Sequence, residues 1–263
     1  MQDGVKFLIK FGERRHLERL ASGSIYFSHA QRFREFEEKL KIRGQGDRYE
    51  GASRIFAQRS SFQNKTSQEA QQLPDGSTFQ ITYESVDNIP VFCLFSCFER
   101  DCIVIDGGTV QININDVVQR DIVDHFEKAD SALIIHNPTS FVNDIRNSIR
   151  GNIKAEQVIY FHVEGYPRKE GGFAIDLDYF KYLCQDTPPR KFKNGYVYSF
   201  NADYSYRALF CKDVFFTNEQ EFRILLPEDS ISKPTEYKIT LNESKLTLVS
   251  LDDLFSGAIT ISA

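Results

Sequence analysis

Residues 215–227 read FFTNEQEFRILLP, a stretch that places two glutamates directly before an apolar run. Residues 220–226 predict a short buried strand that ends at Pro227. In an extended chain, the side chains of Glu219 and Glu221 project to the same face. Two neighbouring carboxylates repel, so one pKa is expected to rise unless a cation intervenes. The stretch is therefore either a paired-acid site or the beginning of an edge strand with solvated charges.

The remainder of the chain predicts a mixture of strands and helices. The expected strands are 5–11, 24–28, 78–84, 91–98, 110–115, 132–136, 158–163, 196–200, 208–212 and 235–241. The expected helices are 13–21, 30–40, 116–130, 141–150, 176–183 and 251–255. Residues 91–98 lack alternation, which predicts burial on both faces, and 158–163 is expected to be a central strand. Because helices and strands do not alternate strictly, an α+β fold on curved or split sheets is expected.

Length and composition are those of an ordinary globular chain. The 263 residues are 41% hydrophobic and 26% charged, and 23 Phe and 12 Tyr without Trp favour sheet. We expect a single domain over residues 1–263. The polar, Gln- and Ser-rich residues around 57–78 predict a mobile insertion in it.

Charge is unevenly distributed along the sequence. Residues 1–70 carry 14 Lys and Arg against 9 Asp and Glu, although the whole chain has a net charge of −5. A basic N-terminal third suits a polyanion such as a dinucleotide or RNA, and equally suits a solvated helix face with mixed charge.

Targeting and cysteine content predict a cytoplasmic protein. The first residues lack the basic start of a signal peptide, and no apolar segment approaches about 20 residues, so no membrane contact is expected. The five cysteines are odd in number and lie mostly in apolar runs, which indicates reduced, buried thiols. Neither they nor the five scattered histidines have the spacing of a metal site, so none is expected.

A second segment of chemical interest is residues 17–28, LERLASGSIYFS. A short helix ends at Gly23, and a strand follows that carries Tyr26 and Ser28. Taken alone, the segment is typical of an ordinary helix-to-strand connection with a packing tyrosine.

Together the two segments resemble ADP-ribosyltransferases. The Glu-x-Glu step with its apolar strand and proline is similar to the active-site strand of mono-ADP-ribosyltransferases. The Gly-x-Ile-Tyr-Phe-Ser stretch resembles the tyrosine strand of the poly-ADP-ribose polymerase and diphtheria-toxin branch, and residues 7–23 resemble the start of DNA- and RNA-directed toxin transferases. The order of these motifs around residues 91–98 is also similar to an uncharacterised bacterial family linked to abortive infection and phage defence.

This resemblance implies a fold, a substrate and partners. The implied fold is an ADP-ribosyltransferase-like split β-sheet core with peripheral helices. The implied activity is transfer of ADP-ribose from NAD to a macromolecular acceptor, either a nucleic acid, RNA included, or a protein. A toxin of this kind, in a toxin–antitoxin or phage-defence system, also implies an inhibitor or antitoxin protein.

The resemblance assigns roles to individual residues. Glu221 is catalytic, since a carboxylate below the ribose stabilises the oxocarbenium-like transition state. Glu219 binds or deprotonates the acceptor, Tyr26 stacks on nicotinamide, and Ser28 hydrogen-bonds the ribose or the carboxamide. The His or Arg on the family's first strand is replaced by Lys10, or by Arg14 or Arg15. Further phosphate contacts are expected from Arg32, Arg34 and Arg48, and the loop 43–51 is expected to close over the site or contact the target.

Three other functions remain open at this point. One is hydrolysis of NAD at the same site, with water as acceptor, and another is a non-catalytic sensor or scaffold of the same fold. The third is a metal-dependent nuclease that uses Asp47, Glu50, Glu219 and Glu221.

Overall fold

The computed structural model describes residues 4–40, 46–47, 49–57, 61–63, 70–72, 77–106, 108–163, 166–167, 173–174, 176–193 and 195–262. The chain divides into two compact units. Unit 1 contains Met1–Arg48, Asn88–Val158 and Phe215–Ala263, and unit 2 contains Tyr49–Asp87 and Ile159–Val214. Each is described separately below, and the single domain expected from the sequence stays a prediction.

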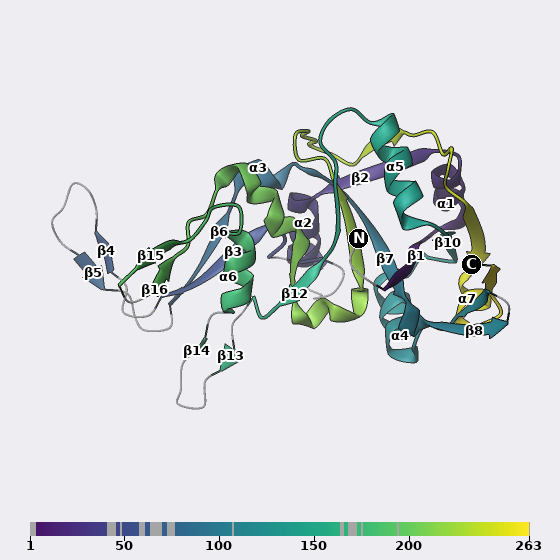
Figure 1. Cartoon of the computed structure of the whole chain (residues 1–263), viewed down its shortest axis with the longest axis horizontal. Helices are drawn as coiled ribbons and strands as arrows, with labels where there is room; N and C mark the ends of the chain where they lie inside the picture. Colours follow the sequence, from purple (N-terminus) through teal and green to yellow (C-terminus); the bar gives the residue numbers. More distant parts are fainter. Residues whose placement is uncertain are drawn as a thin grey trace. The chain divides into compact units, whose positions relative to one another are not determined.

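Unit 1 is built on an antiparallel sheet in which eight strands are found among the described residues (Figure 1). Six of these strands pair in the order β11 (Lys154–Gln157), β18 (Glu221–Leu225), β7 (Pro90–Phe98), β1 (Val5–Gly12), β10 (Ser131–Ile135) and β20 (Leu246–Ser250). The other two are β2 (Ser24–His29), which pairs with β7, and β19 (Thr235–Lys238), which pairs with β2. The antiparallel ladders and separate helices confirm the expected α+β class.

Strand β7 lies at the centre of this sheet and contacts three neighbours. β18 pairs along one edge, from Glu221 opposite Phe95 to Leu225 opposite Val91. On its other edge, β7 pairs first with β2, where Ser28 lies opposite Val91, and then with β1, where Ile9 lies opposite Phe95. The sheet therefore divides at β7. Burial on both faces is confirmed, because seven of its nine residues are buried.

Helices cover both faces of the sheet. On one face, α1 (Arg14–Ala21) and α5 (Pro138–Ser148) bury Leu17, Phe141 and Ile145 against Leu8, Phe27 and Phe222. On the other face, α4 (Asp116–His125) and α7 (Leu251–Phe255) pack with Ile9, Phe95 and Ile134. The apolar stripes of these amphipathic helices are what joins them to the sheet.

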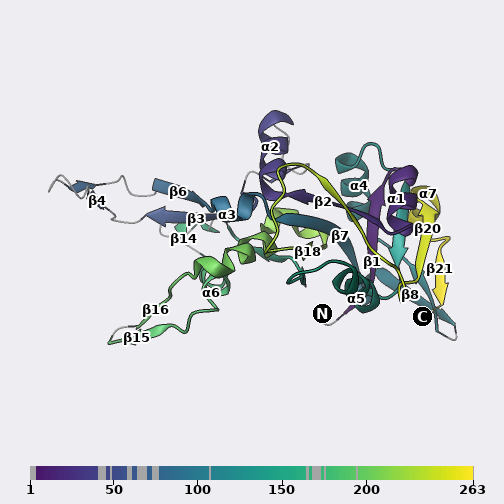
Figure 2. The ribbon, with the colours of Figure 1, turned by 90° about the horizontal axis from the view of Figure 1, so that it is seen from above.

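The remaining elements of unit 1 are peripheral. Helix α2 (Ala30–Leu40) follows β2 directly. The 3₁₀ helix η1 (Glu99–Asp101) precedes β8. The 3₁₀ helix η3 (Val214–Glu219) precedes β18 and begins at the last residue of unit 2. Strands β8 (Cys102–Asp106), β9 (Thr109–Ile112) and β21 (Thr260–Ser262) form an antiparallel sheet, which Figure 2 shows near α7 and β20. The alternating burial of β9 confirms the half-exposed strand expected there.

The described residues of unit 2 contain short strand pairs and three helical segments. Its elements are β3 (Ala52–Ala57), β4 (Ser61–Gln63), β5 (Ala70–Gln72), β6 (Ser77–Thr82), α3 (Glu84–Asp87), β12 (Ile159–Phe161), β13 (Tyr166–Pro167), β14 (Phe173–Ala174), α6 (Leu177–Leu183), β15 (Arg190–Phe192), β16 (Gly195–Val197), η2 (Ala202–Phe210) and β17 (Cys211–Asp213). Its core packs Phe161, Val163, Tyr179 and Leu183 against Ala208 and Cys211.

Several expectations about this region need correction. The strand expected at 158–163 is the short β12, which pairs in parallel with β17 and, among the described strands, belongs to a two-stranded sheet rather than to the main sheet. Residues 208–210 end the helix η2, and the strand begins only at Cys211. Around residues 57–78, β4 pairs with β5 and β3 with β6, and the mobile insertion expected there stays a prediction. Residues 58–60, 64–69 and 73–76 lie outside the described residues.

Candidate functional site

The centre of the candidate site is a buried ion pair on β18. Arg223 donates from a terminal nitrogen to Oε2 of Glu221 at 2.8 Å, and only 1% of Arg223 and 8% of Glu221 is exposed. The two residues are two apart on a strand, so their side chains lie on the same face. A guanidinium in contact with a buried carboxylate stabilises the charged form of that carboxylate. The cation that pairs with Glu221 is thus part of the same strand.

Two further polar groups belong to this cluster. Cys93 on β7 lies opposite Arg223, and the pKa of its thiol is raised well above the usual value, first by burial and then by the charge of Glu221. Lys10 on β1 donates from Nζ to the carbonyl oxygen of Cys93 at 2.7 Å. Burial lowers the pKa of Lys10, while Cys93 and Glu221 act in the opposite direction. Lys10 and Glu221, both predicted site residues, therefore interact electrostatically.

Lys10 occupies the place where the sheet divides. The β1–β7 pairing ends at Ile9, and the β2–β7 pairing ends at Ser28, so the middle of this β7 edge lies between the two strand ends. The Lys10 amine reaches this gap, and it lies 5.1 Å from the centre of the Phe92 ring. Lys10 thus supplies a cation and a hydrogen-bond donor where the strands separate. We call this place the fork, defined by Lys10, Phe92 and Cys93.

The backbone before Glu221 is not extended, which corrects the expected geometry of the two glutamates. Glu219 ends η3, Gln220 has a φ of 41°, and β18 begins at Glu221. A two-residue period holds only within a strand, so Glu219 and Glu221 are not neighbours on one strand face. Glu219 is half-buried, whereas Glu221 is buried.

Side-chain hydrogen bonds hold Gln220 in its left-handed conformation. Its Nε2 donates to the Ser96 carbonyl oxygen at 3.0 Å and to Asp101 Oδ2 at 2.9 Å, and its Oε1 accepts from Arg100 at 2.7 Å. The backbone nitrogen of Ser96 also donates to the Gln220 carbonyl oxygen at 2.7 Å. A left-handed residue other than glycine costs about 1 kcal/mol or more, so these bonds fix where β18 begins and how Glu221 is directed.

Tyr26 and Ser28 lie on the same face of the sheet as Glu221. Directly opposed residues of an antiparallel pair share a face, and this relation links Ser28 to Val91 and Val91 to Leu225. Alternate residues also share a face, which adds Tyr26 on β2 and Glu221 on β18. For straight strands, spacings of about 4.8 Å between strands and about 3.4 Å per residue place the Cα atoms of Tyr26 and Glu221 about 12 Å apart.

Tyr26 belongs to a polar cluster at the surface. Its hydroxyl donates to Glu236 Oε2 at 2.9 Å and accepts from Arg19 at 3.0 Å, and the Arg19 guanidinium lies 5.0 Å from the ring centre. The pKa of Glu236 is lowered to about 2, first by Lys238 and then by hydrogen bonds from Ser24 and Tyr26. Tyr26 is 45% exposed, so part of its side chain is accessible to a planar ligand.

Ser28 is half-buried between Tyr26 and the edge of β7. Its hydroxyl oxygen is inaccessible to solvent and has no hydrogen-bond partner among the described residues. A buried hydroxyl normally forms a hydrogen bond, because an unmet one costs about 1–3 kcal/mol. Ser28 is therefore the predicted site residue with a hydrogen bond still to offer.

The predicted phosphate ligands do not form one cluster in the contacts of the described residues. Arg14 pairs with Glu18 at 3.1 Å and Arg15 pairs with Glu13 at 2.7 Å, both at the surface of α1. On α2, Arg32 is exposed and lies 5.3 Å from the centre of the Phe36 ring, and Arg34 is half-buried.

Two other predicted features have different outcomes. Arg48 and residues 43–45 of the expected closing loop lie outside the described residues. For the nuclease alternative, no three His, Cys, Asp or Glu side chains within the described ranges come close enough to hold a metal ion. Asp47 and Glu50 are themselves buried.

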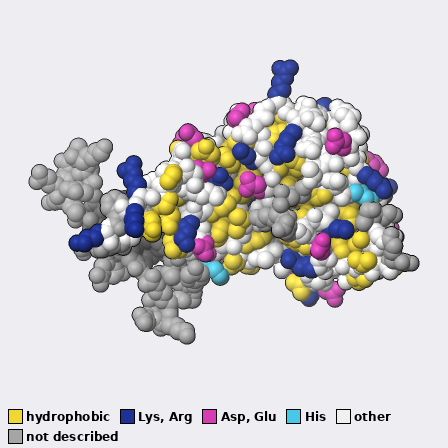
Figure 3. All heavy atoms as spheres, in the orientation of Figure 1, with side chains coloured by type: hydrophobic (Ala, Val, Ile, Leu, Met, Phe, Trp, Pro, Cys, Tyr) yellow, Lys and Arg dark blue, Asp and Glu magenta, His cyan; other side chains and the backbone are white. Residues whose placement is uncertain are grey.

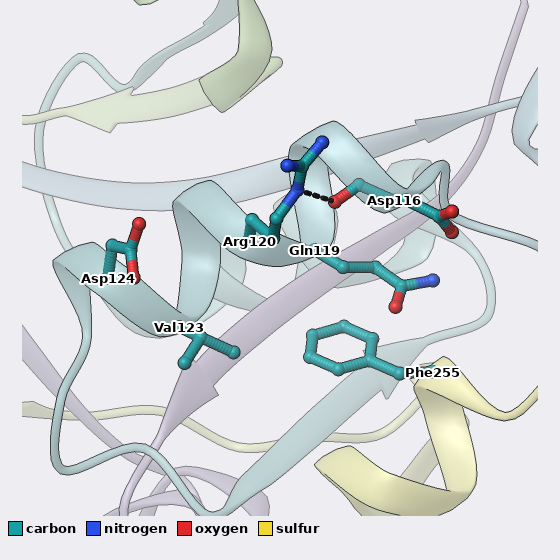
Figure 4. A pocket seen from close by; sticks show the side chains of 6 residues that line it. All are labelled: Asp116, Gln119, Arg120, Val123, Asp124 and Phe255. Atoms are coloured by element: carbon teal, nitrogen blue, oxygen red, sulfur yellow. Dashed lines mark hydrogen bonds between the residues drawn. The ribbon is translucent and has the colours of Figure 1, made fainter.

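A surface pocket lies elsewhere in unit 1. It is open, has a volume of about 540 Å³, and lies between α4 and the end of α7 (Figure 4). Its walls are formed by Asp116, Gln119, Arg120, Val123, Asp124 and Phe255. None of the residues expected from the sequence lines this pocket, so it is not the candidate site.

Four residues that organise this site were not predicted from the sequence. Arg223 could have been predicted from the sequence, because an arginine inside a buried apolar strand must be paired with an acidic group. Gln220, Cys93 and Glu236 could not have been predicted in this way, since their roles depend on strands distant in sequence.

Comparisons with known proteins add no further assignment. No protein-family model, curated protein or solved structure matches this chain. A separate observation concerns membranes: none of the described helices is both long enough and apolar enough to cross one.

Proposed function

We propose that this chain transfers ADP-ribose from NAD to a macromolecular acceptor, with Glu221 as the catalytic carboxylate on an ADP-ribosyltransferase-like split sheet. The observation that carries the proposal is the shared sheet face of Glu221, Tyr26 and Ser28 beside the division at β7. For straight strands, Cα atoms about 12 Å apart leave room between the Tyr26 and Glu221 side chains for a nicotinamide riboside group.

The chemistry follows from the charges in this cluster. Cleavage of the nicotinamide–ribose bond develops positive charge on the ribose, which a fixed carboxylate stabilises. Arg223 holds the Glu221 side chain in one orientation at 2.8 Å, so little reorganisation is needed. Tyr26 stacks on the nicotinamide, and Ser28 donates its hydrogen bond to the ribose or carboxamide. Lys10 at the fork attracts the diphosphate.

Glu219 has a separate role in this proposal. It lies outside β18, at the end of η3, and Gln220 with its left-handed backbone separates it from Glu221 in the chain. From there it binds or deprotonates the acceptor nucleophile. A transferase of this kind, acting as a toxin, also requires an inhibitor or antitoxin partner in its host.

The test measures two products from purified protein, labelled NAD and cell lysate. The wild type is expected to release nicotinamide and to label a macromolecule. Glu221→Gln is expected to lose both by about 100-fold or more, because transition-state charge stabilisation is lost. The matched variant Glu219→Gln is expected to lose labelling but retain nicotinamide release.

Binding is tested separately, because Glu221→Gln weakens a buried ion pair. Tyr26→Ala changes an exposed side chain, and it is expected to raise the KM for NAD while Tyr26→Phe preserves it. Circular dichroism establishes that each variant is folded. Release of ADP-ribose without labelling would identify the protein as an NAD glycohydrolase instead. Wild-type protein that neither binds nor cleaves NAD would leave only the non-catalytic sensor or scaffold.

A further inference from the structure

The β15–β16 hairpin of unit 2 concentrates positive charge and aromatic rings. Residues 187–200 contain three Lys or Arg, four Phe or Tyr and no Asp or Glu, in a chain whose net charge is −5. The strands pair antiparallel, with Lys191 directly opposite Tyr196 and Arg190 opposite Val197. Each face of the hairpin therefore combines one cation with one apolar or aromatic side chain.

These side chains point into solvent. Tyr196 is 60% exposed and Val197 is 48% exposed, and Arg190, Lys191 and Lys193 are all exposed. None of the three cations is ion-paired to a carboxylate in the part of the chain that the structure describes. The hairpin thus presents uncompensated positive charge next to an accessible aromatic ring.

The hairpin is joined to helix α6 of the same unit. Tyr198, just after β16, contacts Phe180 of α6 edge to face, with ring centres 6.2 Å apart. Lys181, the next residue of α6, is exposed and is ion-paired to Asp178 at 3.0 Å. The ring contact between Tyr198 and Phe180 fixes the base of the hairpin.

Figure 3, drawn in the orientation of Figure 1, shows Lys and Arg side chains next to hydrophobic ones over the part of unit 2 that carries β15 and β16. Asp and Glu side chains are more frequent on the rest of the face that is drawn than they are over this part of unit 2. We define the basic hairpin surface as Arg190, Lys191, Lys193 and Tyr196.

We propose that the basic hairpin surface binds single-stranded nucleic acid. Lysine and arginine side chains neutralise phosphates, and an exposed aromatic ring stacks on an unpaired base of any sequence. Directly opposed side chains have Cβ atoms about 5 Å apart, so a base stacked on Tyr196 keeps its phosphate within reach of Lys191.

Two other polyanions fit the surface less well. A membrane surface favours large apolar side chains such as Leu, Phe and Trp for insertion, whereas the exposed ring of Tyr196 carries a hydroxyl group. In a duplex the base faces are covered by stacking, so a duplex offers no face to Tyr196. The inference does not depend on the proposed NAD chemistry.

The experiment measures binding of a fluorescein-labelled 12-nucleotide oligo(U) RNA to the full-length protein by fluorescence anisotropy at low salt. Tyr196→Ala is expected to weaken binding roughly tenfold, because stacking on that ring is lost, and Tyr196→Phe is expected to preserve it. Lys191→Gln with Lys193→Gln is expected to lower the slope of log K against log salt by about 1.4. All of these side chains are exposed, so the variants are expected to fold.

Matched controls come from unit 1. Phe126→Ala removes an exposed ring, and Arg150→Gln removes an exposed cation, and neither is expected to change binding. Parallel titrations use oligo(dT), duplex DNA and vesicles with anionic lipid. Preference for oligo(U) or for oligo(dT) identifies the kind of single strand. Equal or tighter binding of duplex or vesicles, no binding by the wild type, or unchanged binding by Tyr196→Ala would overturn the proposal.

Discussion

Gln220 shows how much a single residue determines in this site. Its left-handed backbone lies directly before β18, and its buried amide joins Ser96, Asp101 and Arg100. Backbone strain therefore destabilises the left-handed conformation of Gln220, while the hydrogen bonds of its side chain stabilise that conformation. Since Glu221 follows immediately, this balance also determines how the proposed catalytic carboxylate is directed.

Substitutions at Gln220 separate these two contributions. Gln220→Ala loses the hydrogen bonds and keeps the strained φ, so the free energy of unfolding is expected to fall by about 3 kcal/mol. Gln220→Gly loses the same bonds but relieves the strain, and it is expected to be about 1 kcal/mol more stable than the alanine variant. Urea denaturation measures both. Equal stability of the two variants would contradict a strained wild-type conformation.

Glu236 gives the surface cluster around Tyr26 a pH dependence. Its pKa is about 2 in the folded chain, below the usual 4.5, chiefly because Lys238 donates to it. A lowered folded-state pKa contributes stability above about pH 4.5, and this contribution is lost as the pH falls toward 2. An NMR titration of the Glu236 carboxyl is expected to show a midpoint near 2, and Lys238→Ala is expected to raise it. A wild-type midpoint near 4.5 would contradict this interpretation.

At the scale of elements, the connection between α1 and β2 depends on Gly23. Its φ is +87°, and a Cβ atom there would lie 2.2 Å from the carbonyl oxygen of Ile239. The backbone nitrogen of Ile239 also donates to the Gly23 carbonyl oxygen at 2.8 Å. The helix end is thus closely packed against the chain after β19, which pairs with β2 and carries Glu236 opposite Tyr26.

A matched pair of glycine variants tests this packing. Gly108, in the turn between β8 and β9, has a similar φ of +97°, but a Cβ atom there would meet open space among the described residues. Gly108→Ala is expected to cost only about 1–2 kcal/mol of unfolding free energy from backbone strain. Gly23→Ala adds a clash with backbone and is expected to cost at least about 2 kcal/mol more. Thermal or urea unfolding measures the difference, and equal costs would show that Ile239 moves away freely.

At the scale of the whole molecule, the two units differ in the cores that support them. The sheet of unit 1 is buried on both faces, with Ile9, Leu133 and Ile134 fully enclosed. Among the described residues, unit 2 has a smaller core around Phe161 and Tyr179. Regions with fewer buried apolar contacts open at lower free energy than large cores do.

Hydrogen exchange is expected to reveal this difference. Amides of β1, β7 and β10 are expected to exchange only through global unfolding, whereas those of α6 and the β15–β16 hairpin exchange through smaller openings. Mass spectrometry of exchanged peptides across a denaturant series measures the opening free energies. Equal values for the two sets would indicate that the chain opens as one cooperative unit.

Local pattern was sufficient to predict most individual elements. The sequence predicted β1, α1, β2, α2, β7 and α7 close to their observed bounds, because helix caps, glycines and apolar periods act over a few residues. It failed where neighbours distant in sequence decide the outcome. Strand β20 and helix η3 were not expected, and β12 was assigned to the wrong sheet.

In the candidate site too, some features follow from the local sequence and others from contacts between distant residues. The sequence by itself determined that Glu221 belongs to a short apolar strand and that Tyr26 lies on a strand after Gly23. Only the tertiary structure decided that β7 joins these two strands, that Arg223 is buried against Glu221, and that Lys10 reaches the fork. The physical reason is that pairing register and burial depend on contacts between residues far apart in the sequence, such as Ser28 with Val91, which no local pattern encodes.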